Sequence, residues 1–223
     1  LSIGSIDVNI MTKVDKKNYF KREELPSEYN DAHAGLRGYA NSDLESSVIF
    51  SAGMNPRLYG YIADFADFFP DVNGYIKKKI ILKVSDYRSA IIQGKFLAKK
   101  GLWISEYRIE SGLNCGGHAF ATDGYLMGPI LAEFRDRRQE LTDELYEVCK
   151  LALEANGKVV PYDPLTITVT AQGGVATAEE HNFLIDHFKL DTVGWGTPFL
   201  LVPEATTVDK ATMKQLQDAK EKD

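Results

Sequence analysis

The chain has 223 residues, 44% of them hydrophobic and 26% charged, which is an ordinary composition for a globular protein with a sizeable core. A net charge of −6 and a pI near 5.3 argue against a general nucleic-acid or anionic-membrane surface. There is no apolar run of about 20 residues and no signal-peptide pattern, and two cysteines are too few for a disulfide framework or a zinc cluster. We therefore expect a cytoplasmic protein without a structural metal.

The first half of the chain alternates apolar strand patterns with helical patterns. Strands are expected at 4–11, 48–51, 79–85 and 103–109. Residues 13–46 are polar, which predicts an irregular excursion followed by a helix near 30–39, with His33 on its surface. Asn55-Pro56 opens the next helix, whose apolar stripe is expected to lie in the core. This stripe consists of Leu58, Tyr61, Ile62, Phe65 and Phe68.

The second half begins with a long amphipathic helix at about 126–155 and continues with strands near 167–171 and 192–195. Between these two strands, Thr177 is the expected N-cap of a helix, and Glu179 and Glu180 place negative charge in its first turn. The side chains expected on the buried face of this helix are Phe183, Leu184 and Phe188. A final helix is expected from Asp209 onward.

Six strands alternating with helices predict an α/β fold with a parallel sheet. No GxGxxG follows a strand, which weakens a dinucleotide-binding interpretation. Glycine turns at strand ends favour a barrel or a doubly wound sheet. A closed (β/α)8 TIM barrel typically needs about 250 residues. We therefore expect residues 1–223 to form one partial barrel domain without its first two βα units. Those units would be supplied by a segment preceding Leu1 or by a separate chain that completes the barrel.

Two glycine turns follow the last two expected strands. Gly173-Gly174 ends the first of these strands, and Gly196-Thr197 ends the second, one βα unit later. Backbone N–H groups in such turns can bind a phosphate, and the usual phosphate site of a barrel lies in the loops after strands seven and eight. The alternative is that the glycines only permit tight turns.

The residue type most suited to catalysis lies in the loop after the strand at 103–109. His118 follows Gly116-Gly117 at a strand's carboxyl end, where catalytic residues of barrels lie. An imidazole titrates near pH 6.5 and can therefore take a proton from an activated carbon or return it. A structural hydrogen bond for His118 and a nucleophilic role for Cys115 are the alternatives. His181 and His187 stand six positions apart on one expected helix, which does not suit a metal site.

Four short motifs resemble, in order and spacing, those of the nitronate monooxygenase family, formerly called 2-nitropropane dioxygenases, and of the related flavin-dependent enoyl-ACP reductase. The motifs are IDVN at 6–9, NCGGH at 114–118, AQGGV at 171–175 and WGTPFL at 195–200. They are similar to the family's Phe-Gly-Val-Asn, Ala-Gly-Gly-His, Ala-Gly-Gly-Ile and Met-Gly-Thr-Arg-Phe-Leu. The resemblance implies that the chain represents strands three to eight of an FMN-binding (β/α)8 barrel.

The resemblance also implies the roles of individual residues. His118 would be the base or acid over the flavin, and Asn9 would hydrogen-bond the isoalloxazine ring. Gly116 and Gly117 would approach the flavin closely, and the FMN phosphate would be held by Gly173, Gly174, Gly196 and Thr197. To these we add Lys83, in the expected third strand of this chain, as a charge near the flavin N1 edge. Pro198 and Cys115 replace the family's Arg and Ala, a departure that concerns the substrate more than the cofactor.

The resulting expectation is an FMN-dependent oxidoreductase of the nitronate monooxygenase-like type, acting on a small carbon acid or enoyl substrate. One alternative is a phosphate-binding TIM-barrel lyase or isomerase without flavin. Another is a non-catalytic barrel subunit. In each case the partner is a small molecule or the chain that completes the barrel, and neither nucleic acid nor membrane is expected.

Overall fold

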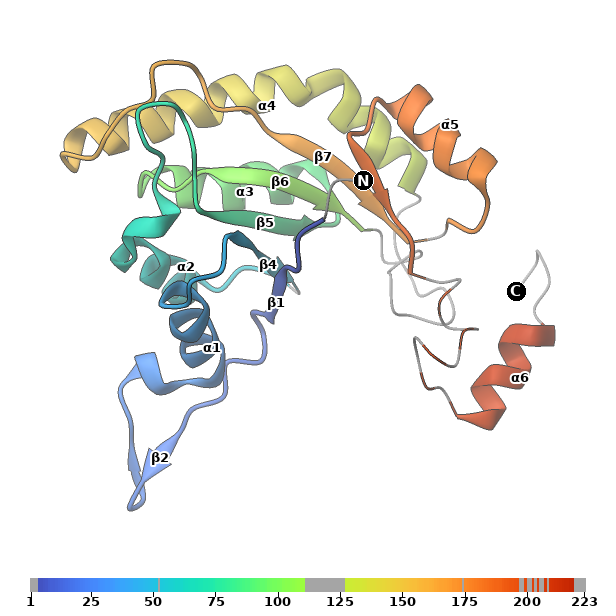
Figure 1. Ribbon diagram of the computed structural model, residues 1–223, viewed down its shortest axis with the longest axis horizontal. Coiled ribbons are helices and arrows are strands. Elements are labelled where there is room, and N and C mark those ends of the chain that lie inside the picture. Colours follow the sequence, from blue (N-terminus) through green and yellow to red (C-terminus); the bar gives the residue numbers. More distant parts are fainter. Residues whose placement is uncertain are drawn as a thin grey trace. The chain divides into compact units, whose positions relative to one another are not determined.

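The computed structural model describes residues 4–51, 53–110, 127–173, 175–196, 199, 202, 204, 207 and 209–218. Strands and helices alternate along the chain (Figure 1). Six strands form one sheet in the order β1-β4-β5-β6-β7-β8, and every pair of them whose register is defined is parallel. The expected α/β class with a parallel sheet is thus confirmed, and its closure into a barrel stays a prediction.

The boundaries of the strands lie within two residues of those expected, except that β1 begins four residues later. The strands of the sheet are β1 (Val8–Met11), β4 (Ser46–Ser51), β5 (Lys78–Val84), β6 (Ile104–Ile109), β7 (Thr168–Gln172) and β8 (Thr192–Gly194). The α-helices are α1 (Asp31–Ala40), α2 (Pro56–Tyr61), α3 (Tyr87–Ala98), α4 (Met127–Ala155), α5 (Ala178–Phe188) and α6 (Lys210–Asp218). Short 3-10 helices are η1 (Ser27–Tyr29), η2 (Ile62–Asp64) and η3 (Ala66–Phe68). None of the helices in the described ranges is both long and apolar enough to cross a membrane.

The chain divides into two compact units. The first unit comprises Leu1–Lys83, Arg88–Tyr107 and Gln139–Ile167. The second comprises Val84–Tyr87, Arg108–Arg138 and Thr168–Asp223. Each unit is described separately below.

The core of the first unit is built around strands that are buried on both faces. All six residues of β4 are buried, and Val48 and Phe50 pair with Ile80 and Leu82 of β5. Strands that are buried along their whole length are typical of parallel sheets that are covered on both sides. The expected stripe of the helix after Asn55 is buried at Leu58, Ile62 and Phe68, whereas Tyr61 and Phe65 are half-buried.

Helix α3 comes very close to its neighbours in the first unit at Gly94. A Cβ atom at this position would lie 2.8 Å from Leu145 Cδ1 of α4 and in contact with the hydroxyl of Tyr107 in β6. The same hydroxyl donates a hydrogen bond to the carbonyl of Ala90, one turn earlier in α3 (3.1 Å). Glycine therefore permits a helix, a strand and a second helix to pack at one point.

The segment at 13–46 contains more regular structure than the sequence predicts. A hairpin of β2 (Tyr19–Phe20) and β3 (Glu23–Glu24) extends beyond α1, as Figure 1 shows. Both residues of its two-residue tip, Lys21 and Arg22, have positive φ angles (50° and 72°), the geometry favoured by tight hairpins. Lys17 pairs with Glu24 at 2.8 Å and braces this hairpin.

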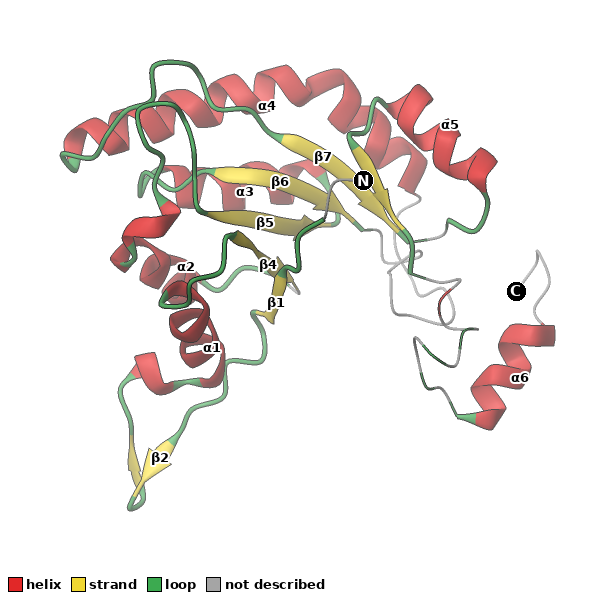
Figure 2. Cartoon of the chain, viewed as in Figure 1, coloured by secondary structure: helices red, strands yellow, loops and turns green. Residues whose placement is uncertain are grey.

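In the second unit, α5 connects the neighbouring strands β7 and β8 (Figure 2). Phe188 is buried as expected, and Leu184 is half-buried. The expectation for Phe183 is wrong, because this side chain is 56% exposed. Its ring instead stacks on His187, one helical turn further on, with the ring centres 5.0 Å apart. The two rings thus cover each other on the outer face of the helix.

Candidate functional site

The two predicted glycine turns emerge from strands that are direct neighbours in the sheet. Ala171 pairs with Val193 and Gln172 with Gly194 in parallel register, so β7 and β8 end at the same edge. Gly173 follows β7 directly, and Gly196 lies two residues beyond β8. Gly173 has a φ of +96°, a conformation that residues with side chains rarely adopt. The sequence-based prediction that these turns follow adjacent strands is confirmed.

Helix α5 begins beside this edge with a complete capping box. Thr177 Oγ1 accepts a hydrogen bond from Glu180 N at 3.2 Å, which confirms Thr177 as the N-cap. The Glu180 carboxylate in turn accepts hydrogen bonds from the N–H groups of Ala176 (2.8 Å) and Thr177 (3.0 Å). These hydrogen bonds lower the pKa of Glu180. Because the protein's own carboxylate occupies these donors, a phosphate at this edge would rely on the glycine turns themselves.

A contact that the sequence did not reveal links the end of β8 to α5. The indole Nε1 of Trp195 donates a hydrogen bond to Nδ1 of His181 at 3.0 Å. A neutral His181 that accepts at Nδ1 carries its proton on Nε2. The turn after β8 is thereby fastened to the helix that precedes that strand.

The remaining predicted site residues are distributed over both units. Asn9 is an exposed residue of β1, and its Oδ1 accepts a hydrogen bond from Ser51 Oγ of the neighbouring β4 (3.0 Å). Lys83 is half-buried near the end of β5. The other predicted site residues lie outside the described residues, and their roles stay predictions: Gly116, Gly117, His118, Gly174 and Thr197.

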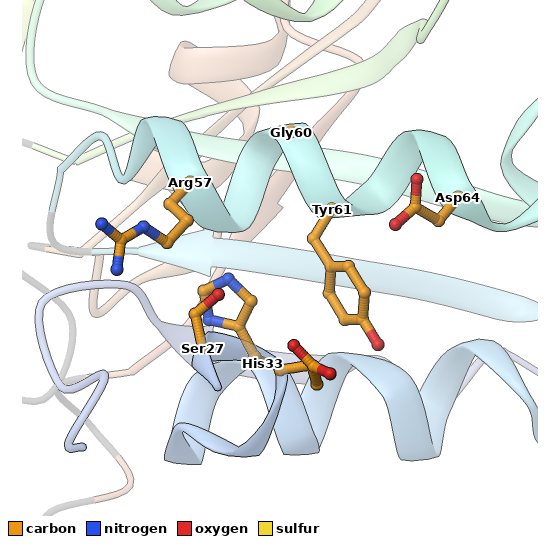
Figure 3. A pocket seen from close by; sticks show the side chains of 7 residues that line it. Ser27, His33, Arg57, Gly60, Tyr61 and Asp64 are labelled. Atoms are coloured by element: carbon orange, nitrogen blue, oxygen red, sulfur yellow. The ribbon is translucent and has the colours of Figure 1, made fainter. Parts of the chain in front are cut away.

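A separate pocket of about 460 Å³ lies within the first unit (Figure 3). The residues that line it are Ser27, Glu28, His33, Arg57, Gly60, Tyr61 and Asp64. The expectation that His33 is a surface residue is wrong, since it is only 1% exposed. Its imidazole lies between α1 and α2, and its ring centre is 5.4 Å from that of Tyr61. The packing of these two helices is therefore the reason for its burial.

Asp15, in the loop after β1, organises this side of the first unit. Its Oδ1 accepts hydrogen bonds from the N–H groups of Ala32 (3.0 Å) and His33 (3.4 Å) in the first turn of α1. Its Oδ2 lies 2.8 Å from His33 Nδ1, a close contact whose geometry is not that of a hydrogen bond. One carboxylate therefore both caps a helix and orients a buried imidazole. Within the described ranges, Nε2 of His33 has no hydrogen-bond partner.

Asn55 connects the same loop to α2. Its Oδ1 accepts a hydrogen bond from Leu58 N at 3.1 Å, so Asn55 is the N-cap and Pro56 the first helical residue, as the sequence predicts. Its Nδ2 donates to the Thr12 carbonyl (3.2 Å) and, at 3.4 Å, to Asp15 Oδ2. Asp15 and Asn55 thus connect the loop after β1 to the first turns of α1 and α2, the two helices that line the pocket.

No family model matches this chain, and no curated protein matches its sequence. Among solved structures it is similar to the enoyl reductase domain of MlnA from the macrolactin biosynthesis cluster of Bacillus amyloliquefaciens, with a TM-score of 0.53 and 16% identity. The match covers 82% of this chain but only 41% of that one. At this identity the likeness is one of fold. It agrees with the expected relation to enoyl reductases, whereas the relation to nitronate monooxygenases stays a prediction.

Proposed function

We propose that this chain belongs to an FMN-dependent oxidoreductase that acts on a small carbon acid or an enoyl substrate. The observation that supports it most is the pair of glycine turns at the shared edge of β7 and β8. The likeness in fold to an enoyl reductase domain adds support. Neither observation names the substrate, which the proposal leaves at the level of a chemical class.

Two described features, one in each unit, are each suited to a part of a flavin mononucleotide. The backbone at Gly173 and Gly196 would hold its phosphate together with Gly174 and Thr197, and the φ of +96° at Gly173 strongly disfavours a side chain there. The Ser51 hydroxyl fixes Oδ1 of Asn9, so that the amide Nδ2 is left to donate to a flavin acceptor. Lys83 would supply positive charge near the ring, and Gly116 and Gly117 would allow close approach. When bound, the flavin supplies hydride transfer, and we assign the accompanying proton to His118.

Titration of FMN into the purified protein, followed by quenching of flavin fluorescence, tests this proposal. In Gly173→Ala a methyl group at φ +96° must distort the turn, and we expect FMN affinity to fall about tenfold or more. Gly157→Ala is the matched control, because Gly157 also has a positive φ (62°) but ends α4, away from any strand end. Equal FMN affinities of the two variants would contradict the proposal. Binding of a phosphorylated metabolite but not of FMN would favour the lyase or isomerase alternative.

A second variant tests the assignment of the proton. His118→Ala is expected to bind FMN normally. The reaction of the bound flavin with a nitronate or enoyl substrate is expected to slow by roughly 10²–10⁴-fold. Rapid-mixing kinetics at the flavin absorbance band measure the rate, and the FMN titration measures binding. Loss of FMN binding in this variant would instead favour a structural hydrogen bond for His118.

A further inference from the structure

The pocket of the first unit has the properties of a binding site for a second ligand. It combines a volume of about 460 Å³, within the range of small-molecule sites, with a lining that is largely polar. It draws residues from three elements, namely η1, α1 and the continuous α2–η2 segment. These residues do not include any of those assigned above to the flavin.

His33 provides the first indication of a ligand. Its side chain is 2% exposed, its Nδ1 faces Asp15 Oδ2, and its Nε2 is buried without a partner in the part of the chain that the structure describes. A buried polar atom without a hydrogen bond costs about 1–3 kcal/mol, so such atoms are rare in folded proteins. Figure 3 shows one ring nitrogen turned away from α1 toward the helix that carries Arg57 and Tyr61. A ligand group in the pocket would satisfy it.

The charged groups of the lining provide the second indication, because they are separated by sign. Arg57 and Asp64 stand seven positions apart on the α2–η2 segment, a distance of about 10 Å along a helix. Figure 3 shows the guanidinium at one end of the pocket, the Asp64 carboxylate at the other, and the Tyr61 ring between them. Among the described residues, neither Arg57 nor Asp64 has an ion-pair partner. The side chain of Glu28 adds a second carboxylate to the lining.

We propose that this pocket binds an extended zwitterion, such as a basic amino acid or a short peptide. Arg57 and the Nε2 group of His33 bind its carboxylate, and Asp64 binds its ammonium group. The ring of Tyr61 packs against the aliphatic part between the two charges. A ligand with two negative charges would be repelled by Asp64 and Glu28, and a ligand with positive charge alone would leave Arg57 without a counter-charge.

The probe that matches this description most simply is 6-aminohexanoate, which carries a carboxylate and an ammonium group at the two ends of a flexible chain. L-Lysine is a second probe with a similarly distant pair of charges. Hexanoate and hexylamine each retain one charge and most of the chain, and glycine retains both charges at short range. By isothermal titration calorimetry, we expect 6-aminohexanoate and L-lysine to bind and the three controls to bind about tenfold more weakly or not at all. Absence of binding by both probes, or equal binding of hexanoate or hexylamine, would overturn the proposal.

Two variants on the exposed rim test the two ends of the pocket without disturbing the buried network. Arg57→Gln and Asp64→Asn are each expected to weaken 6-aminohexanoate binding about tenfold. The matched controls are Arg88→Gln and Asp163→Asn, at exposed positions of the same unit outside the pocket. If the controls weaken binding as much as the pocket variants do, the probe binds through general surface charge and the proposal fails.

Nitrogen NMR of the imidazole rings tests the part played by His33 in the unaltered protein. The chain has four histidines, and we expect 6-aminohexanoate to shift the ring nitrogens of His33 while those of His181 and His187 stay in place. A shift at His33 supports the assignment of Nε2 to the ligand carboxylate. Saturating probe without any shift at His33 would exclude that contact. Because FMN is absent from this measurement, its result is independent of the flavin proposal.

Discussion

The two polar regions of this protein are constructed in opposite ways. In the first unit, a half-buried carboxylate, Asp15, receives contacts from the backbone and from the side chains of His33, Asn30 and Asn55. In the second unit, the edge of β7 and β8 is formed by backbone turns, and its one carboxylate cap, Glu180, is exposed. The side-chain network should therefore be sensitive to single truncations, whereas the turn region should tolerate them and respond chiefly to changes at its glycines.

The most severe test of this contrast is Asp15→Ala. The substitution leaves the imidazole of His33 and the N–H groups at the start of α1 buried without their acceptor, and the side chain it removes is only 11% exposed. Leaving a buried hydrogen-bonding group without its partner costs about 1–3 kcal/mol for each group, so we expect this variant to lose more unfolding free energy than the loss of one hydrogen bond would cause. Urea unfolding monitored by circular dichroism measures it, with Asp163→Ala as an exposed control expected to change stability by no more than about 0.5 kcal/mol. Similar losses in both variants would remove the distinction between the two regions.

A smaller effect is expected at a second buried hydrogen bond of the first unit. Tyr59 donates its hydroxyl proton to Gln93 Oε1 at 2.8 Å, and both residues are buried. Tyr59→Phe leaves this amide oxygen without a donor, and we expect the variant to lose about 1–3 kcal/mol in the same urea assay. Tyr162→Phe, at a position that is 80% exposed, is the control and should be neutral. A neutral Tyr59→Phe would show that the sensitivity is confined to Asp15.

In the second unit, the corresponding truncation is Thr177→Ala, which removes the N-cap of α5. Loss of such a cap costs about 1 kcal/mol, well below the effect expected at Asp15. Thr166→Ala is a suitable control, because Thr166 is exposed and its side chain makes no hydrogen bond in the described part of the chain. A loss at Thr177 as large as that at Asp15 would contradict the idea that the turn region depends little on side chains.

The smallest effect concerns pH and Glu180. Hydrogen bonds from Ala176 N and Thr177 N lower its pKa from the ordinary value of 4.5, so its contribution to stability is fully present above that value. As the pH falls through the lower pKa of the folded state, this contribution is lost. The difference in stability between the natural protein and Glu180→Gln should therefore be constant from neutral pH to about 4.5 and shrink at lower pH. A difference that grows on acidification would show that the carboxylate is not the group that caps the helix.

Features that depend on neighbouring residues could be predicted from the sequence. Thr177 and Asn55 are identified as N-caps because capping residues act within three positions of their partners. The order of the strands follows from their alternation with helices, since parallel neighbours require a crossover. The placement of two glycine turns at one sheet edge follows from the same reasoning.

Features that depend on distant contacts were missed. Asp15 and His33 are 18 residues apart, and no periodic pattern joins them. The burial of His33 nevertheless has a local signal, because it stands three positions before Leu36 and seven before Ala40, which are both buried in α1. Phe183 shows the opposite error: it adjoins Leu184, which stands four positions before the buried Phe188, but its own ring rests on His187 at the helix surface. The polarity of a side chain alone therefore did not distinguish the buried position of His33 from the exposed position of Phe183.

The close approach at Gly94 has a consequence for tracing the ancestry of this chain. A larger residue at position 94 would have to be accompanied by a smaller one at 107 or 145, since the hydroxyl of Tyr107 and a methyl group of Leu145 occupy the space of its Cβ. These three positions should therefore change together over evolution. A glycine at 94 joined to a tyrosine at 107 would be a recognisable mark of common descent in homologues whose overall identity is too low to show it.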